Sequence, residues 1–294
     1  MIRAAILGAS GYVGGELMRL LAGHPAIEVV RAFGASAAGK PVSELHPHLG
    51  LAYGDWRFDS WEEDLDDCDL VFAALPHGES QKLVDAIGNR KFVDLGADFR
   101  LDSAQAYETW YGEKHQRPDL LPRFIYGLPE FRRGDIAVAN RVAAPRCYPT
   151  AAGLALKPLV DAGAIESKGI VVDAASGVSG AGRAASAGTH YCAVDGNFRA
   201  YGLLNHRHTA EMQMVTGAEI LFTPHLAPMS RGILATCYAR ATGPCDPLAI
   251  LREAYAAEPF VHVGETLPET KWATGSNAAF LTASFDERTG LVVA

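Results

Sequence analysis

The chain has 294 residues, of which 49% are hydrophobic and 20% are charged, with a formal net charge of −8. This composition is typical of a globular protein with one large or two medium domains. The negative charge argues against nucleic acid or an anionic membrane surface as a partner. No segment approaches the roughly 18 consecutive apolar residues that a membrane span requires. Five cysteines without a CxxC pair argue against a disulfide framework or a cysteine zinc site, so we expect a protein of the reducing cytoplasm.

The N-terminus predicts a strand, a glycine turn and a helix. Residues 2–7 are mostly apolar and run directly into the turn, which is unlike a cleaved signal peptide. The glycines stand at Gly8, Gly11 and Gly14, a GxxGxxG spacing and not the more usual GxGxxG. Gly8 and Gly11 would let the backbone approach a pyrophosphate at the helix N-terminus, and Gly14 would allow close packing of helix on strand. We therefore predict a dinucleotide-binding unit.

The segment after the second predicted strand, residues 28–33, bears on the choice of cofactor. A fold that selects NAD usually places an acidic residue at the end of this strand, and residues 34–40 contain none. Ser36 and Lys40 suit a 2′-phosphate better, which favours NADP. The alternative is a flexible surface loop in which Lys40 is only solvated.

Two further apolar runs, residues 70–75 and 92–95, alternate with helical stretches, which indicates parallel βαβ units. Ligands of such folds collect at the carboxyl ends of the strands, so residues 75–80 and 98–100 are candidates for a site. His77 is equally well explained as a solvated turn residue. His46 and His48 lack supporting ligands and indicate a polar loop, and we expect no metal.

Cys147 is the candidate nucleophile. It follows a predicted strand at residues 135–140 and precedes a predicted helix at residues 151–162. The amides of a helix N-terminus and the charge of Arg146 would lower the pKa of the thiol, and the thiolate is the reactive form. The alternative is that Cys147 is a small buried filler.

The second half of the chain contains a second glycine-rich loop and a histidine segment. A predicted strand at residues 169–174 enters residues 175–183, whose amides could cradle an anion with Arg183; the alternative is a flexible linker. His206 and Glu211 could meet at the start of a helix as an acid/base residue and its supporting carboxylate, whereas a zinc pair of His206 and His208 lacks further ligands. Predicted strands at residues 219–222, 232–241, 280–285 and 291–293, with a helix at 247–256, suit an antiparallel sheet at a dimer interface.

Seven motifs together resemble the semialdehyde dehydrogenase superfamily, and within it the N-acetyl-gamma-glutamyl-phosphate reductases of arginine biosynthesis. They are residues 8–16, 94–100, 126–130, 147–150, 176–183, 205–209 and 222–232, and they span nearly the whole chain. The resemblance implies an NADP-dependent reductive dephosphorylation of a small-molecule acyl phosphate. Cys147 would form a thioester, and His206 would act as acid/base with Glu211 in support.

The resemblance also implies the binding residues. Those expected to contact NADP are Gly8, Ser10, Gly11, Tyr12, Val13, Gly14, Ser36, Leu75, Ser179, Gly180 and Asn277. Arg100, Arg183 and Arg207 are candidates for the substrate's charged groups.

We therefore expect an α/β fold with a Rossmann-like NADP-binding domain at residues 1–146 and an α+β catalytic and dimerisation domain at residues 147–294. A homo-oligomer, a dimer or a tetramer, is expected. Members of the family usually continue with a C-terminal helix that returns to the first domain, and this sequence stops before it. One alternative is the related reductase of lysine biosynthesis, whose substrate is linked to an amino-group carrier protein. Another is a non-catalytic NADP-binding sensor or scaffold.

Overall fold

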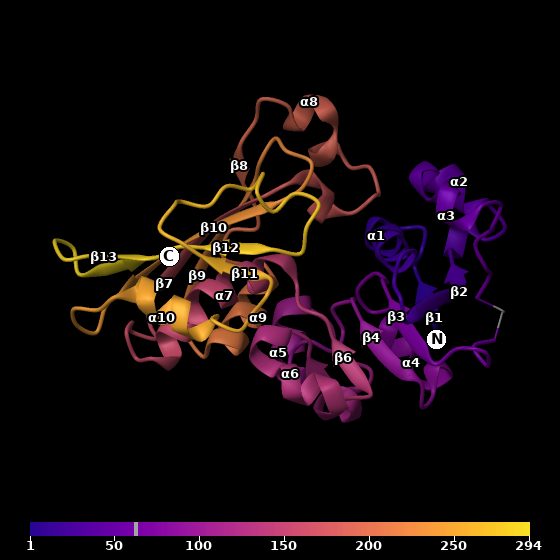
Figure 1. Ribbon diagram of the computed structural model, residues 1–294, viewed down its shortest axis with the longest axis horizontal. Helices are drawn as coiled ribbons and strands as arrows, with labels where there is room; N and C mark the ends of the chain where they lie inside the picture. The colour runs from indigo at the N-terminus through magenta and orange to yellow at the C-terminus, as the bar shows by residue number, and fades with distance from the viewer. Residues whose placement is uncertain (62–63) are drawn as a thin grey trace. The chain divides into compact units, whose positions relative to one another are not determined.

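The computed structural model describes residues 1–61 and 64–294. The chain divides into two compact units, of which the first comprises residues 1–108 and 113–145 and the second comprises residues 109–112 and 146–294. Each unit contains a six-stranded sheet (Figure 1).

Unit 1 contains a parallel sheet in the order β2-β1-β3-β4-β6-β5. Its strands are β1 (Ile2–Leu7), β2 (Ile27–Phe33), β3 (Leu70–Ala73), β4 (Lys91–Asp94), β5 (Ile125–Tyr126) and β6 (Arg141–Ala143). Its helices are α1 (Tyr12–Leu21), α2 (Val42–Leu45), α3 (Gly50–Tyr53), α4 (Ser80–Ile87), α6 (Pro129–Val138) and the first part of α5 (Ala104–Tyr111), whose residues 109–111 belong to unit 2. The 3-10 turns are η1 (Ala35–Ala37), η2 (Pro47–Leu49) and η3 (Pro118–Arg123). Two apolar clusters pack on this sheet, one around Val71, Phe92 and Phe99 and one around Ile6, Met18 and Phe58. The predicted parallel βαβ architecture is confirmed.

Unit 2 contains a mixed sheet in the order β13-β14-β10-β7-β9-β8 and a parallel pair of β11 and β12. The strands are β7 (Ile170–Ser176), β8 (Arg199–Ala200), β9 (Ile220–Leu226), β10 (Ile233–Arg240), β11 (Val261–Val263), β12 (Ala279–Leu281), β13 (Ser284–Asp286) and β14 (Leu291–Val293). The helices are α7 (Cys147–Asp161), α8 (Tyr191–Val194), α9 (His208–Thr216) and α10 (Pro247–Ala254), with 3-10 turns η4 (Val178–Ala181) and η5 (Ala187–Thr189).

The two faces of the unit 2 sheet differ. Val172, Phe222 and Cys237 point to a buried face, which α7 and α9 cover. Leu221 and Tyr238 point the other way and are 48% and 37% exposed. Alternation of buried and exposed residues along each strand is expected of a sheet covered on one face only.

Three predictions about elements were wrong. Residues 135–138 form the end of α6, and residues 139–140 follow it without forming a strand. A short apolar run such as Ile136 to Val138 fits either structure, and here Val138 is 82% exposed on a helix that begins with Pro129. Residues 280–285 are divided between two strands, β12 and β13, of different sheets. The main sheet of unit 2 is mixed and not antiparallel, because the connection from β7 to β9 runs through α9 and brings the two strands parallel.

Candidate active site

Cys147 is the first residue of α7, and Arg146 before it is the extended N-cap residue. The next turn is closed by Thr150, whose backbone N–H and hydroxyl both donate to the Arg146 carbonyl at 2.9 and 2.8 Å. Glu211, in the first turn of α9 and 1% exposed, accepts a hydrogen bond from the Arg146 backbone N–H at 2.8 Å. A carboxylate near a helix N-terminus is favoured by the helix dipole, so Glu211 fastens α9 to the start of α7.

The pKa of the Cys147 thiol is raised above its ordinary value. Burial by the surrounding protein disfavours the charged thiolate, and the negative charge of Glu211 disfavours it further. The residue is nevertheless exposed at the surface of the chain. The amides of Cys147 and Tyr148 and the charge of Arg146 act in the opposite direction, but they do not prevail. The expectation of a lowered pKa was therefore wrong in sign, because the sequence shows the helix N-terminus and not the burial around it.

His206 lies in a cluster of rings. Its ring centroid is 5.7 Å from that of Tyr148, 5.5 Å from Tyr201, 4.5 Å from His208 and 5.3 Å from Phe222, each in an edge-to-face arrangement. Because Tyr148 directly follows Cys147, this packing brings His206 to the N-terminal turn of α7. The sequence prediction that the cysteine and histidine segments share one region therefore agrees with the geometry.

The electrostatics of this cluster keep His206 neutral. Burial, with the charges of Arg207 and Arg146, lowers its pKa to about 4. The backbone N–H of His208 donates to His206 Nδ1 at 3.2 Å, so a neutral ring carries its proton on Nε2. The turn before it is held in an unusual conformation, with Leu204 at φ +64°. His206 is therefore prepared to donate from Nε2.

Tyr201 is a residue of this site that the sequence did not single out. Its hydroxyl lies 3.2 Å from that of Tyr148, which also donates to the His225 carbonyl at 3.3 Å. Burial raises the pKa of both tyrosines, and a Cys147 thiolate would raise it further, so all three side chains share one electrostatic environment. No motif marked Tyr201, because it stands in an irregular loop and its hydroxyl meets that of Tyr148, which is distant in sequence.

The glycine-rich loop after β7 is fixed in place and is not a flexible linker at its start. Ser179 N–H donates to the Ser230 carbonyl at 3.0 Å, and a Cβ on Gly177 would lie 2.7 Å from the Arg231 nitrogen. Gly180 follows within the same short turn η4. Arg183 lies in the exposed continuation of the loop.

The remaining candidates of unit 2 lie at its surface. Arg207 is exposed, and its guanidinium carbon lies 5.2 Å from the centroid of the Tyr111 ring. Asn277 is exposed in the segment before β12. Their roles in binding stay predictions.

In unit 1 the backbone of the glycine turn leaves no space for a side chain at Gly8 or Gly14, as a dinucleotide-binding turn requires. Gly8 has φ +78°, and a Cβ there would lie 2.4 Å from the Ala74 carbonyl oxygen. A Cβ on Gly14 would lie 2.3 Å from the Gly8 carbonyl oxygen, which agrees with the predicted close approach of helix and turn. Gly11 is the N-cap of α1, and a Cβ there would meet only the Gly8 oxygen at 3.4 Å. Gly11 thus leaves open space at the helix N-terminus.

Side chains around this turn connect it to the end of β2. Ser10 Oγ donates to the Gly34 carbonyl at 3.1 Å, whereas Tyr12 and Val13 are exposed on the first turn of α1. Ser36 is exposed in η1, directly after β2, and the preceding Ala35 has φ +46°, a strained conformation for a residue other than glycine.

Two cationic side chains, Lys40 and Arg57, lie at the end of the segment 34–40 that contains Ser36. Lys40 Nζ pairs with Glu44 at 3.0 Å, and Arg57 donates to the Gly39 carbonyl at 2.7 Å. Within residues 34–40 there is no carboxylate. The surroundings of Ser36 therefore suit an anionic group.

The loops after β3 and β4 are joined by Asp98, which is fully buried. Its carboxylate accepts from the backbone N–H groups of Gly78 at 2.7 Å and Gln81 at 3.1 Å. His77 lies 3.1 Å from both the Tyr107 hydroxyl and a Glu113 carboxylate oxygen, so its side chain is more than a solvated turn residue. Leu75, half-buried, precedes this network.

Arg100 is 3% exposed and donates to the carbonyls of Ala144 and Leu95, each at 2.6 Å. These bonds hold the ends of β4 and β6 together, which favours a structural role over direct contact with substrate. His46 likewise differs from the polar loop that we expected, because it is 5% exposed, with Nε2 3.0 Å from the Ala9 carbonyl oxygen.

The described residues contain neither a metal-binding cluster nor a membrane-spanning helix. Among residues 1–61 and 64–294 there is no group of three or more His, Cys, Asp and Glu side chains that would hold a metal ion. Within the same residues no helix has the length and apolarity to cross a membrane.

Comparison with known proteins agrees with this description. A family model of the semialdehyde dehydrogenase NAD-binding domain matches residues 3–139, and one of the semialdehyde dehydrogenase dimerisation domain matches residues 147–294. Among solved structures, aspartate semialdehyde dehydrogenase II of Vibrio cholerae has a TM-score of 0.73 at 18% identity, covering 100% of this chain and 93% of its own. The Candida albicans enzyme, described with NADP, has a TM-score of 0.71 at 14% identity, covering 100% and 93%. These two structures show the shared fold.

Curated relatives are more similar in sequence. A protein of Symbiobacterium thermophilum named N-acetyl-gamma-glutamyl-phosphate reductase is 45% identical, over 99% of this chain and 88% of its own length. One of the same name from Geobacter sulfurreducens is 43% identical, over 100% of this chain and 89% of its own length. The chain therefore belongs to the semialdehyde dehydrogenase family, in the branch of the N-acetyl-gamma-glutamyl-phosphate reductases.

Proposed function

We propose that this enzyme reduces N-acetyl-gamma-glutamyl phosphate to the corresponding 5-semialdehyde, with release of phosphate, as a cytoplasmic step of arginine biosynthesis. The observation that carries the proposal is the accessible Cys147 at the N-terminus of α7, with the neutral ring of His206 packed against the following residue, Tyr148. The printed names of relatives 40–45% identical supply the substrate.

The first step is an acyl transfer to sulfur. Cys147 Sγ attacks the acyl carbon, the bond from that carbon to the phosphate oxygen breaks, and the thiol proton leaves with the phosphate. The product is a thioester on Cys147. Covalent catalysis of this kind divides one difficult reaction into two easier ones.

The N-terminus of α7 stabilises negative charge on the sulfur both when it attacks the substrate and when it leaves the reduced intermediate. The amides of Cys147 and Tyr148 and the charge of Arg146 favour a thiolate, although burial and Glu211 outweigh them at rest. The same groups stabilise the sulfur as it departs when the reduced intermediate collapses to the aldehyde. Glu211 contributes by fixing the Arg146 backbone through the 2.8 Å hydrogen bond.

His206 acts on the carbonyl oxygen of the substrate. Because its Nδ1 accepts from His208 N–H, the proton on Nε2 is the one available for donation. We assign His206 as the donor to the substrate carbonyl oxygen, where negative charge develops on attack.

The residues of unit 1 fit NADP. Gly8, Gly11 and Gly14 form the turn for the pyrophosphate, and Ser36 and Lys40 suit the 2′-phosphate because the end of β2 lacks an acidic residue. Ser10, Tyr12, Val13, Leu75, Ser179, Gly180 and Asn277 complete the proposed contacts. NADPH, when bound, supplies the hydride that reduces the thioester.

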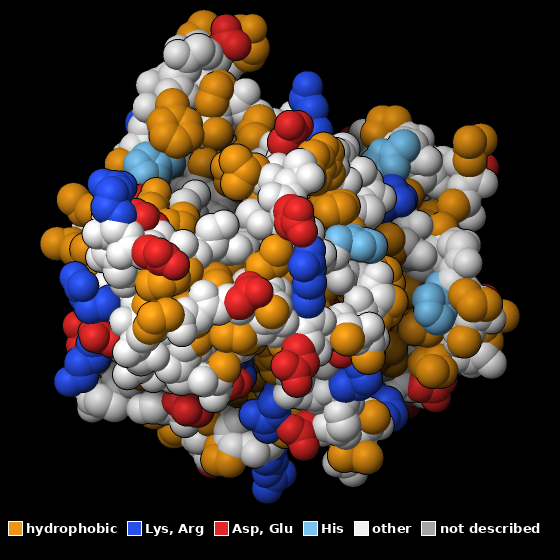
Figure 2. All heavy atoms as spheres, turned by 60° about the vertical axis from the view of Figure 1, so that its left-hand side comes forward, with side chains coloured by type: hydrophobic (Ala, Val, Ile, Leu, Met, Phe, Trp, Pro, Cys, Tyr) orange, Lys and Arg blue, Asp and Glu red, His pale blue; other side chains and the backbone are white. Residues whose placement is uncertain are grey.

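The open face of the unit 2 sheet supports a homo-oligomer. Tyr238, Val171 and Leu221 stand side by side across β10, β7 and β9, and Leu234 lies on the same face. Leu221 and Leu234 are 48% and 41% exposed. The region around α8, at the top of Figures 1 and 2, adds Tyr191 at 77% and Phe198 at 59%. Exposed apolar surface of this extent is typical of an interface.

Trapping the thioester tests the proposal. The protein is mixed with the acyl phosphate in the absence of NADPH, and the Cys147 peptide is examined by mass spectrometry for an N-acetylglutamyl adduct, with Cys147→Ser as the control. We expect the adduct on the wild type alone. A wild type that acylates only with carrier-linked substrate would identify the lysine-type reductase, and no adduct from either substrate would identify a non-catalytic protein.

A further inference from the structure

Unit 1 contains a polar cavity at the amino-terminal edge of its sheet. It has a volume of about 340 Å³ and is lined by Gly88, Asn89, Arg90, Arg123, Asn140 and Arg141. These residues stand where α4 leads into β4, where η3 ends and where β6 begins. The glycine turn and the other candidate cofactor loops follow the carboxyl ends of strands, so this cavity lies at the opposite edge of the same sheet.

Arg141 carries the strongest sign of a missing partner. One terminal nitrogen donates to the Gly88 carbonyl at 3.1 Å, and the guanidinium lies over the Phe124 ring, 5.7 Å from its centroid. The other terminal nitrogen, Nη1, is buried and has no hydrogen-bond partner. Buried donors of charged groups are nearly always satisfied in folded proteins, so this nitrogen requires an acceptor.

The neighbouring charges do not supply one. Arg90 is engaged with Asp66 at 3.0 Å, and Arg117 nearby is engaged with Asp85 and Asp119 at 2.6 and 3.1 Å. Among the described residues, neither Arg123 nor Arg141 forms an ion pair. Instead, burial and the charges of Arg123 and Arg117 lower the pKa of Arg141, so its charge is opposed.

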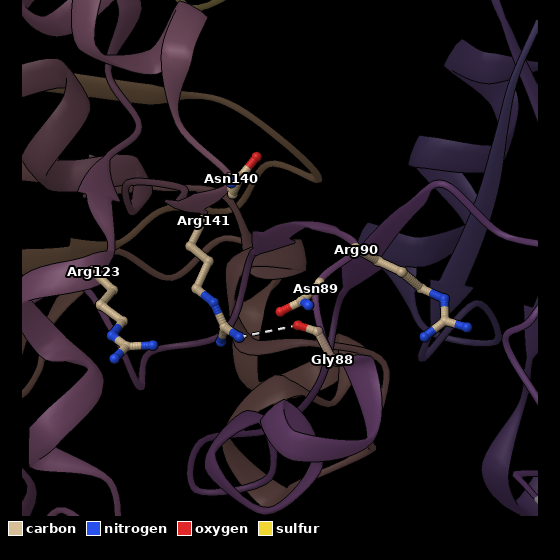
Figure 3. A pocket seen from close by; sticks show the side chains of 6 residues that line it. All are labelled: Gly88, Asn89, Arg90, Arg123, Asn140 and Arg141. Atoms are coloured by element: carbon tan, nitrogen blue, oxygen red, sulfur yellow. Dashed lines mark hydrogen bonds between the residues drawn. The ribbon is translucent and has the colours of Figure 1, made fainter.

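The side chains are arranged around a common space. Figure 3 shows Arg123 and Arg141 extending in the same direction from neighbouring elements, with Asn89 on the side of Arg141 and Arg90 pointing away. Two guanidinium groups with free donors, beside an amide, match the several oxygens and the double charge of a phosphate group. The volume is at the lower end of the range for small-molecule sites.

We propose that this cavity binds a phosphate-class dianion between Arg123 and Arg141, at the edge of the unit 1 sheet opposite the candidate cofactor loops. The anion would accept a hydrogen bond from Arg141 Nη1 and would balance the positive charges of Arg123 and Arg141. The proposal is independent of the reaction assigned to Cys147.

Calorimetry with inorganic phosphate at low ionic strength tests it, using the full chain. Arg123→Ala removes an exposed side chain and should leave the fold intact. Arg141→Lys keeps the positive charge but removes the paired N–H donors of the guanidinium group. Arg132→Ala is the matched control, because Arg132 is an exposed arginine of the same unit that pairs with Asp135. We expect the first two variants to lose one phosphate site per chain, or to bind there at least tenfold more weakly, and the control to match the wild type.

Crystals soaked in selenate locate the site directly through anomalous scattering, with a peak expected between Arg123 and Arg141. An Arg123→Ala isotherm identical to that of the wild type would overturn the proposal, as would binding that saturates only at molar selenate. An Arg123→Ala enzyme whose KM for phosphate rises in the assay of the reverse reaction would also overturn it, because the arginines would then belong to the catalytic phosphate.

Discussion

The carboxylate of Glu211 accepts a hydrogen bond from the backbone N–H of Arg146 at 2.8 Å, one residue before Cys147. This contact places a buried negative charge beside the helix N-terminus that would activate the thiol. It positions the segment and at the same time opposes the thiolate. Burial is the larger cause of the raised pKa of the Cys147 thiol, and the charge of Glu211 adds to it.

The raised pKa of Cys147 predicts slow alkylation at neutral pH. Iodoacetamide should modify Cys147 no faster than the exposed Cys192 at pH 7, with a rate that rises as the pH passes above the range of an ordinary thiol. Burial raises the pKa values of Cys68 and Cys237 to about 12, so these thiols should stay unmodified.

Glu211→Gln should lower the pKa of Cys147, because it removes the charge that raises it while keeping an oxygen for the Arg146 N–H. The pH dependence of Cys147 labelling, followed by peptide mass spectrometry, should move to lower pH. Glu253→Gln, a change on α10, serves as the control. A profile that does not move in Glu211→Gln would remove Glu211 from the electrostatics of the site.

His206 should titrate at about pH 4, and its neutral ring should carry the proton on Nε2. Its folded-state pKa is lower than its ordinary 6.5, so the unfolded chain binds more protons between these values. The contribution of His206 to stability is therefore complete above pH 6.5 and is lost as the pH falls toward 4, by up to about 3 kcal/mol. Heteronuclear NMR of the imidazole nitrogens measures both the pKa and the tautomer.

Replacing the same ring tests its role in the reaction. His206→Asn should lower kcat by about 10²–10⁴-fold, the usual range for loss of an acid/base residue. Thioester formation on Cys147 should still be detectable, because the nucleophile remains. A variant with normal kcat would exclude His206 as the proton donor.

Gly14→Ala should disrupt the turn that we assign to NADP. Its Cβ would lie 2.3 Å from the Gly8 carbonyl oxygen, within the backbone of the turn. Such overpacking costs about 1–3 kcal/mol and would displace the backbone that faces the cofactor. Fluorescence titration should show NADPH binding weakened at least tenfold. Gly23→Ala is the control, because a Cβ there meets nothing within 4 Å; equal binding by the two variants would contradict the assignment.

Ser36→Asp should shift the proposed cofactor preference from NADP towards NAD. A carboxylate directly after β2 would repel the 2′-phosphate of NADP and accept a hydrogen bond from the 2′-hydroxyl of NAD. The ratio of kcat/KM for NADPH to that for NADH should fall by at least tenfold. The variant Ser43→Asp, on α2, gives the effect of charge alone. An unchanged ratio in Ser36→Asp would show that the 2′-phosphate binds elsewhere.

The sequence predicted most of unit 1, because its glycine spacing and apolar runs are local signals of strand, turn and helix. It failed where a short run such as Ile136 to Val138 fits two structures. At the site, Cys147 and His206 were found from their residue types and motifs. The raised pKa of Cys147, the Nε2 proton of His206 and the position of Tyr201 depend on packing between distant segments, which no local pattern encodes.

The proposed thioester on Cys147 requires phosphate as a co-substrate when the reaction runs in reverse. Reduction of NADP by N-acetylglutamate 5-semialdehyde, followed at the nicotinamide absorbance with and without inorganic phosphate, tests it most directly. We expect activity that requires phosphate in the wild type and no activity in Cys147→Ser. Activity that persists in Cys147→Ser, or that proceeds equally without phosphate, would contradict it.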